Sequence, residues 1–447
     1  MKKNFIDRRQ FLIQAGTYAA ALSFARPALA RDAREYGVLP NRREDQSRAF
    51  QRMIDRAAKQ RAKVYLPNGT YAISGVQLPD FVDLAGDGDH VTLVNTTRNP
   101  LLNSRGGATA RLENILIDGV HLGGEDSNSA LIDLRQVTRV ELKGITIRRA
   151  RYDALRLERC SGSITQCNIS DSGRFGLYAI ESKALNISHN TVEDCADGGI
   201  IIHRYEQGYD GSRVRNNIVR RISAVRGGTG QWGNGINIFK TDDVEITDNT
   251  IEDCAFSAMR ANTARNFKMN NNTCLRSGEM AIFAEFGFRN AEIKDNIVIG
   301  AASGISATNA NVGGGGAIIT GNIVKDMNAI GPYKPQAPYF GQGISAEADA
   351  LVAQNTIENT AGYGINLGWG PYLRNVDVVG NTIKNAKIGI GISAAKGAGP
   401  VSIKGNQINA REGNIRTHEW DKISTTDIGL KPDQAPKHIT LEGNIIG

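Results

Sequence analysis

Short runs of alternating apolar and polar residues recur along most of the chain, and many enclose an asparagine in the frame apolar-x-x-Asn-x-apolar. In one such run, Ile246 and Ile251 flank Asn249. Alternation over runs this short predicts β-strands rather than helices. The asparagine returns at intervals of 23 to 38 residues, at Asn190, Asn217, Asn249, Asn272, Asn296, Asn322, Asn355, Asn381, Asn406 and Asn444.

A period in the low twenties with occasional insertions is typical of a solenoid, in which each repeat is one stackable unit. Three short strands and their turns fit into about 23 residues. The pattern therefore predicts an all-β fold, a single-stranded right-handed parallel β-helix. Because the asparagine lies at a turn between two strands, we expect it to adopt the left-handed conformation and to bond to the asparagine of the next coil.

The same frame continues toward the N-terminus with other residues at the asparagine position. It places Cys167, Ile145 and Val120 there. The ladder is therefore predicted to be apolar in the first coils and polar later. We assign the β-helix repeats to residues 101–447.

The segment before these repeats has a different pattern. Asp45 can cap a helix, and the apolar positions of that helix are Ala49, Phe50, Met53, Ile54, Ala57 and Ala58. A terminal helix covers the apolar end of a solenoid, which is otherwise an edge open to aggregation. We therefore expect residues 31–100 to form an N-terminal cap and the first coils.

Residues 1–30 have the features of an export signal. Arg8 and Arg9 precede Phe11, an Ala-rich apolar stretch follows, and an Ala-x-Ala sequence ends at Ala30. This arrangement resembles a twin-arginine signal peptide. It implies contact with the twin-arginine export machinery and a periplasmic or secreted protein, with no membrane span in the mature chain. Because that route exports folded proteins, a cofactor carrier is one function it leaves open.

Charge and cysteine content narrow the choice of partners. The formal net charge is +7, of which residues 1–30 account for +4, so +3 remains for the rest. No basic stripe indicates nucleic-acid binding. Of the five cysteines, Cys195 and Cys254 occupy the same repeat position two coils apart, about 9.6 Å at normal strand spacing, which is too far for a disulfide. We interpret the cysteines as small buried interior residues.

Two segments resemble known families. The layout of Tyr36-Gly37-Val38, the expected helix and Leu84-Ala-Gly86 is similar to the opening of pectate-lyase-superfamily β-helix proteins. The central repeats resemble those of mannuronan C5-epimerases, and signal and repeats together resemble a family of twin-arginine-translocated repeat proteins. The resemblance implies a groove along the strand after each Gly-Ile pair, with a polysaccharide, in particular a polyuronate, as substrate.

Alternation along these groove strands predicts several polar side chains that face outward on one surface. Lyases and epimerases of uronic acids need a group that neutralises the sugar carboxylate, a base for the C5 proton and an acid. We predict the catalytic residues His203, Tyr178 and Arg260, and the substrate-binding residues Asn237, Asn262 and Glu285.

Two tryptophans lie outside the repeat frame. Trp232 belongs to an insertion over residues 224–235, and Trp369 opens the segment Trp-Gly-Pro-Tyr after a groove strand. Long loops on a rigid scaffold often bear function, so we predict that both rings stack on sugars. The alternative is that the loops only cover the flank of the helix.

The preferred function is lyase or C5-epimerase chemistry on an acidic polysaccharide. A non-catalytic carbohydrate-binding or envelope-structural protein is one alternative. A glycoside hydrolase is another, but it needs two carboxylates about 5–9.5 Å apart, and the groove-strand glutamates are too many coils apart. The sequence does not decide whether Ca²⁺ is required.

Overall fold

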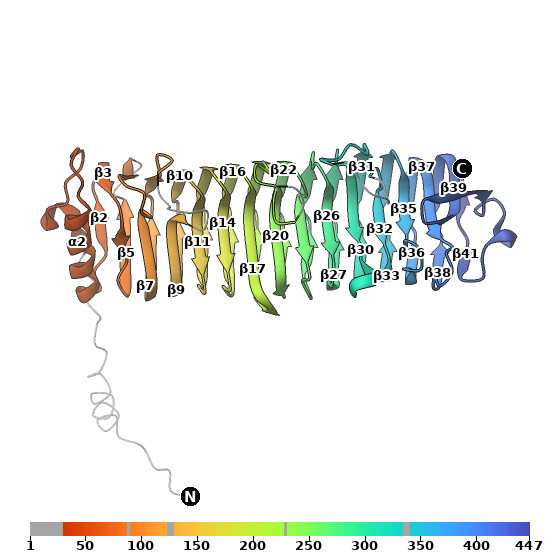
Figure 1. Ribbon diagram of the computed structural model, residues 1–447, viewed down its shortest axis with the longest axis horizontal. Coiled ribbons are helices and arrows are strands. Elements are labelled where there is room, and N and C mark those ends of the chain that lie inside the picture. The colour runs from red at the N-terminus through yellow and green to blue at the C-terminus, as the bar shows by residue number, and fades with distance from the viewer. Residues whose placement is uncertain (1–29, 87–89, 123–128, 228–229, 334–339) are drawn as a thin grey trace, which may run out of the picture.

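The chain forms an elongated solenoid with the cap helix at one end and the C-terminus at the other (Figure 1). The computed structural model describes residues 30–86, 90–122, 129–227, 230–333 and 340–447, so Arg8 and Arg9 lie outside the described residues. Each central coil supplies three strands, for example β15 (Leu185–Ser188), β16 (Thr191–Cys195) and β17 (Gly198–Tyr209). Each of these pairs in parallel with the corresponding strand of the next coil. The predicted right-handed parallel β-helix is confirmed.

The interior is a stack of branched aliphatic side chains. Ile187, Val214 and Ile246 occupy matching registers in successive coils, and none is exposed. A glycine near the start of several groove strands is required by close packing. A Cβ on Gly235 would lie 2.5 Å from Cγ2 of Ile251 and 2.8 Å from the carbonyl oxygen of Ala258. A larger residue there would push the coils apart.

The asparagine ladder is confirmed along its whole length. Asn217 shows the repeated contacts: its Nδ2 donates to Oδ1 of Asn249 at 2.9 Å and to the carbonyl of Ile187 at 3.0 Å. Its Oδ1 accepts from both the backbone N–H and Nδ2 of Asn190. The expectation of a left-handed asparagine is wrong. The residue before each ladder asparagine has positive φ, as at His189 with φ 58°, and this leaves the asparagine side chain pointing inward.

One predicted ladder position is also wrong. Strand pairing aligns Thr146 with Leu116, so the residue level with Ile145 is Ile115 and not Val120. Ile115 is buried, whereas Val120 is 37% exposed and has φ 50°. The apolar frame repeats twice within a few residues there, and only the pairing distinguishes the two registers.

The N-terminal cap is helix α2 (Ser47–Gln60), whose Phe50, Met53 and Ile54 are buried. The predicted helix is confirmed, but its N-cap residue is Gln46 and not Asp45. Asp45 lies one residue earlier and accepts a hydrogen bond from the backbone N–H of Ser47 at 2.9 Å. In the described residues, no helix is both long and apolar enough to cross a membrane.

All five cysteines are buried with free thiols, as interpreted from the sequence. Burial raises the pKa of each thiol, for example that of Cys195 to about 12. These cysteines are therefore packing residues rather than nucleophiles.

The groove strands form one continuous face of the solenoid, which we call the third sheet. Its central strands are β14 (Phe175–Ile180), β17 (Gly198–Tyr209), β20 (Asn234–Asp242), β23 (Met259–Asn262), β26 (Met280–Glu285), β29 (Ser303–Ala307), β32 (Ile344–Ala346) and β35 (Tyr363–Leu367).

Candidate functional site

The predicted catalytic histidine lies on the third sheet but does not open to solvent. His203 is 9% exposed, because Tyr178 and Phe239 on the adjacent strands pack edge-on against its two sides, with ring centroids 5.4 and 5.5 Å away. The expectation that His203 faces an open groove is therefore wrong. Period-two alternation gives the direction of a side chain, but neighbouring aromatic rings decide whether water reaches it.

Burial also changes the titration of this histidine. The pKa of His203 is lowered to about 3, first by desolvation and then by the nearby Arg174. Its Nδ1 lies 3.5 Å from the hydroxyl of half-buried Tyr178, and its Nε2 has no hydrogen-bond partner among the described residues. The side chain is thus a neutral imidazole. Its catalytic role stays a prediction.

Arg260 and Glu285, predicted to meet the substrate, instead bind each other. Nε of Arg260 donates to Oε1 of Glu285 at 2.6 Å, and Nη1 donates to the carbonyl of Gly230 at 2.6 Å. Both side chains are buried, and burial raises the pKa of Glu285 in spite of the arginine. The expected outward cation is therefore already neutralised by a carboxylate and covered by the 224–235 insertion.

The two predicted amides differ in exposure. Asn262 is half-buried and donates from Nδ2 to Glu285 at 2.8 Å, so it belongs to the same buried cluster. Asn237 is 3% exposed, and its Oδ1 has no partner. The structure thus gathers the predicted residues on one sheet but packs most of them beneath other side chains. The expectation that Asn237, Arg260 and Glu285 face solvent is wrong.

The long insertions account for much of this burial. Trp232 stacks on Phe175 with centroids 5.7 Å apart. Tyr333 packs against Phe256 at 6.2 Å and donates its hydroxyl hydrogen bond to Glu279. Both rings therefore pack against other aromatic rings of the protein, which agrees with the alternative that the loops only cover the flank of the helix. A sugar-stacking role for Trp232 stays a prediction, and one face of its ring is already occupied.

Trp369 has a different environment, because it lines an open pocket near the C-terminal end. The pocket has a volume of about 390 Å³. Tyr363 of β35 lies on one side, and Trp420, between β39 (Gln407–Glu419) and β40 (Lys422–Asp427), lies on another. The two indole rings meet edge-on with centroids 5.7 Å apart. Three aromatic rings thus surround a cavity of the size that a small ligand fills.

Polar groups line the same pocket, which we call the aromatic pocket. Asn366 faces it, and Oδ1 of this residue accepts from Nε2 of buried His418 at 3.0 Å. Burial lowers the pKa of His418 to about 4, so the ring is neutral and holds the amide in one orientation. Lys387 of β37 (Thr382–Ser393) also lines the pocket, and its only ion pair in the described residues is a long one of 3.9 Å to Glu412.

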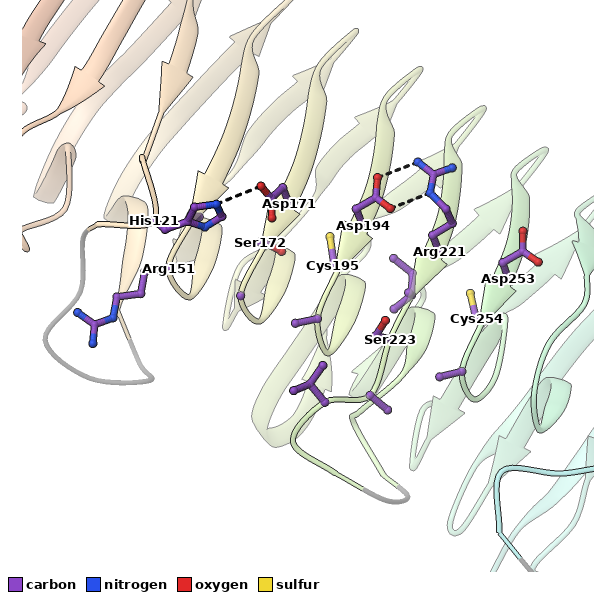
Figure 2. A pocket seen from close by; sticks show the side chains of 17 residues that line it. His121, Arg151, Asp171, Ser172, Asp194, Cys195, Arg221, Ser223, Asp253 and Cys254 are labelled. Carbon is purple, nitrogen blue, oxygen red and sulfur yellow. Dashed lines mark hydrogen bonds and ion pairs between the residues drawn. The ribbon is translucent and has the colours of Figure 1, made fainter.

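A second depression, the flank cleft, runs across several coils on another side of the solenoid (Figure 2). Its volume is about 800 Å³. The charged side chains on it bind one another: Arg221 donates to Asp194 at 2.7 Å, and His121 lies 3.3 Å from Asp171. The first pair links adjacent coils, and the second spans the coil that lies between its two residues. The cleft is therefore large enough for a ligand, but most of its charged side chains are already paired with one another.

Neither depression is a metal centre. Within residues 30–447, excluding the undescribed segments, no three His, Cys, Asp or Glu side chains gather closely enough to hold a metal ion. The described residues thus do not fit a Ca²⁺ or copper site built from these ligands.

Sequence reasoning found Trp369 but missed its partners Trp420, Tyr363 and Lys387. Trp420 lies on an antiparallel hairpin of β39 and β40 that follows no repeat frame. The sequence does contain one indication of them. His418 and Trp420 are two residues apart in the long interval between Asn406 and Asn444, where the asparagine frame is interrupted.

Family comparisons agree with the fold. A model described as a right-handed beta helix region matches residues 102–313, and one described as periplasmic copper-binding protein (NosD) matches residues 211–430. Each match spans just under half of the 447 residues. A search of curated protein sequences gives no match.

Solved structures with similar coils have diverse roles. The A-module of a mannuronan C-5 epimerase from Azotobacter vinelandii has a TM-score of 0.50 at 16% identity, covering 80% of this chain and 97% of that one. The N-terminal fragment of bacteriophage phi29 gene product 12 has 0.52 at 15%, covering 89% and 72%. The Streptococcus pneumoniae surface adhesin PfbA has 0.50 at 13%, covering 88% and 94%. At such identities these structures support the fold alone. Together with the described coils, they make the chain a right-handed parallel β-helix protein.

Proposed function

We propose that this is an exported β-helix protein that binds an acidic polysaccharide in the aromatic pocket. The observation that carries the proposal is the cavity of about 390 Å³ bordered by Trp369, Trp420 and Tyr363. Aromatic faces take up the apolar face of a sugar ring, and Asn366 supplies an oriented amide for a hydroxyl. The polysaccharide class follows the resemblance of the central repeats to those of mannuronan C5-epimerases, and a location outside the cytoplasm agrees with the family model described as periplasmic.

Lys387 is the reason why we expect the aromatic pocket to prefer acidic sugars. Its side chain is 46% exposed and lines the pocket, and its nearest carboxylate is 3.9 Å away. An ammonium in this position can attract the carboxylate of a uronic acid residue. Neutral sugars would gain the stacking but not this ion pair.

The test is saccharide binding measured by calorimetry on polyuronate and neutral oligosaccharides. Trp369→Ala should weaken binding by about two- to tenfold, since one ring contact contributes about 0.5–1.5 kcal/mol and 1.4 kcal/mol is tenfold. Trp232→Ala is the matched control, because that ring packs on Phe175 away from the pocket. Lys387→Met should remove the preference for uronates and leave neutral sugars unaffected. Equal loss in Trp232→Ala and Trp369→Ala would refute the assignment of the pocket.

Lyase or epimerase chemistry is a second candidate, favoured by the contact between Tyr178 and His203 across adjacent strands. It requires the cover of this pair to open, because His203 is buried. Ultraviolet absorbance of unsaturated ends reports lyase action, and exchange of the C5 proton reports epimerisation. Turnover that is lost in His203→Ala would favour this candidate over binding alone.

A further inference from the structure

A small polar cavity lies on the edge of the third sheet beside β17. It has a volume of about 350 Å³ and is lined by Arg159, Lys183, Arg204 and Glu181, together with the backbone near Cys160. The lining side chains are three cations and one carboxylate, a formal net of +2. This excess distinguishes it from the flank cleft, whose charges are paired.

The charges of this cavity are only partly satisfied. Arg204 is 11% exposed and donates from Nη2 to Glu181 at 2.9 Å, whereas its Nε and Nη1 are buried without a hydrogen-bond partner in the described residues. Lys183 is exposed, and its ammonium forms no ion pair in the described residues. Arg159, which is also exposed, pairs with Glu158 at 3.4 Å. The charge that a bound anion would meet is therefore that of Arg159 and Lys183, because the unpaired nitrogens of Arg204 are covered.

Neighbouring carboxylates offset only part of this positive charge. Glu158 already contacts two other arginines, Arg156 at 3.2 Å and Arg135 at 3.7 Å. Buried Asp210 interacts electrostatically with Arg204 without forming an ion pair with it in the described part of the chain. Burial raises the pKa of this carboxyl to about 6, so at neutral pH it is ionised and offsets part of the charge of Arg204. The cationic ends of Arg159 and Lys183 therefore remain available at the mouth of the cavity.

The local fold shows why the cavity exists at this coil. The pairing of β17 with β20 shifts register between His203 and Gly208, so the intervening residues bulge out of the sheet. The bulge leaves Tyr205 55% exposed next to Glu181 of the cavity wall. Oε1 of Glu181 accepts the backbone N–H of Tyr205 at 2.5 Å, which ties the bulge to the cavity wall.

We propose that this cavity binds the phosphate group of a phosphate monoester or of free phosphate. A dianion matches a formal +2 lining better than a monovalent carboxylate does, and Arg and Lys are the residues that hold phosphate oxygens in proteins. The exposed ring of Tyr205, whose backbone is bonded to Glu181, provides an aromatic surface near the cavity for the organic part of a monoester. The site is separate from the aromatic pocket, and the proposal does not depend on the proposed function.

The experiment measures the melting temperature of the purified protein while inorganic phosphate is added at constant ionic strength, with chloride as the balancing anion. Wild type should show a saturable rise. The variant Arg159→Ala/Lys183→Ala should lose that rise while keeping its melting temperature in chloride. The matched control Arg213→Ala/Lys268→Ala removes two exposed cations that pair with Glu245 and should respond like wild type.

Further arms separate the possible ligands. If glucose 1-phosphate saturates at lower concentration than inorganic phosphate, the site takes a monoester; equal or weaker response assigns it to free phosphate. Glucuronate should give no saturable rise. The proposal is overturned if glucuronate matches phosphate, if chloride alone reproduces the effect, or if the cavity variant responds as strongly as the control.

Discussion

Removal of one rung from the asparagine ladder should destabilise the protein far more when the rung is interior. Asn272 is 1% exposed. Its Oδ1 is the acceptor for the backbone N–H of Asn249 at 3.0 Å, and its Nδ2 donates to the carbonyl of Ile246 at 2.9 Å and to Asn296 at 3.1 Å. Asn272→Ala removes these contacts, together with the bonds to Nδ2 of Asn249 and to the carbonyl of Asn270, in a place that water does not reach.

The magnitude follows from which groups lose every partner. The N–H of Asn249 is left buried without an acceptor, which costs roughly 1–3 kcal/mol. The other bonds have alternative partners, so their net loss adds about 1 kcal/mol. We therefore expect a loss of about 2–4 kcal/mol in the free energy of unfolding. Urea titration followed by circular dichroism measures it, and hydrogen exchange should show faster exchange at Asn249.

Asn444 provides the matched control. It accepts the same two bonds from Asn406, each at 3.0 Å, but it is the last rung and is half-buried. Water can replace its contacts, so Asn444→Ala should cost less than about 1 kcal/mol. If the two variants were equally destabilised, or if Asn272→Ala changed nothing, the ladder would not be a source of stability.

Two further predictions concern the buried groups of the third sheet. Arg260→Met should lower the free energy of unfolding by about 3–5 kcal/mol, because it leaves the charge of Glu285 unpaired. The double variant Arg260→Met/Glu285→Gln should recover most of this stability, as measured by urea midpoints in a double-mutant cycle. A loss that persists in the double variant contradicts this account. The pKa of His203 is about 3 in the folded protein and 6.5 in the unfolded chain. Between pH 6.5 and pH 3, therefore, the unfolded chain binds a proton that the folded protein does not. The free energy of unfolding decreases as the pH falls through this range. His203→Gln should remove this loss, roughly 2–3 kcal/mol at pH 4.5 relative to neutral pH, and an unchanged pH profile would show that the imidazole is not kept neutral.

The repeat frame was sufficient to predict the fold and the face on which polar residues gather. Asn249 marks a turn, and the alternation after it correctly places Arg260 and Asn262 on the outer side of β23. Such patterns are local, because period-two alternation follows from strand geometry alone.

Exposure could not be predicted in the same way. Whether Arg260 meets solvent depends on Gly230 and Glu285, which come from an insertion and from the next coil. The aromatic pocket likewise depends on Trp420, which a hairpin outside the repeat brings next to Trp369. Contacts between irregular segments do not repeat with the period of the coils, so the asparagine frame does not predict them.

The rungs of the ladder are interchangeable. Every interior rung offers the same acceptor to the coil before it and the same donor to the coil after it, as Asn217 and Asn249 do. A segment from one rung to the next, such as 249–271, could be lost or duplicated by recombination and leave two equivalent surfaces in contact. The solenoid can therefore change in length during evolution by whole coils. The aromatic pocket would be unaffected, because the residues that line it all belong to the last coils.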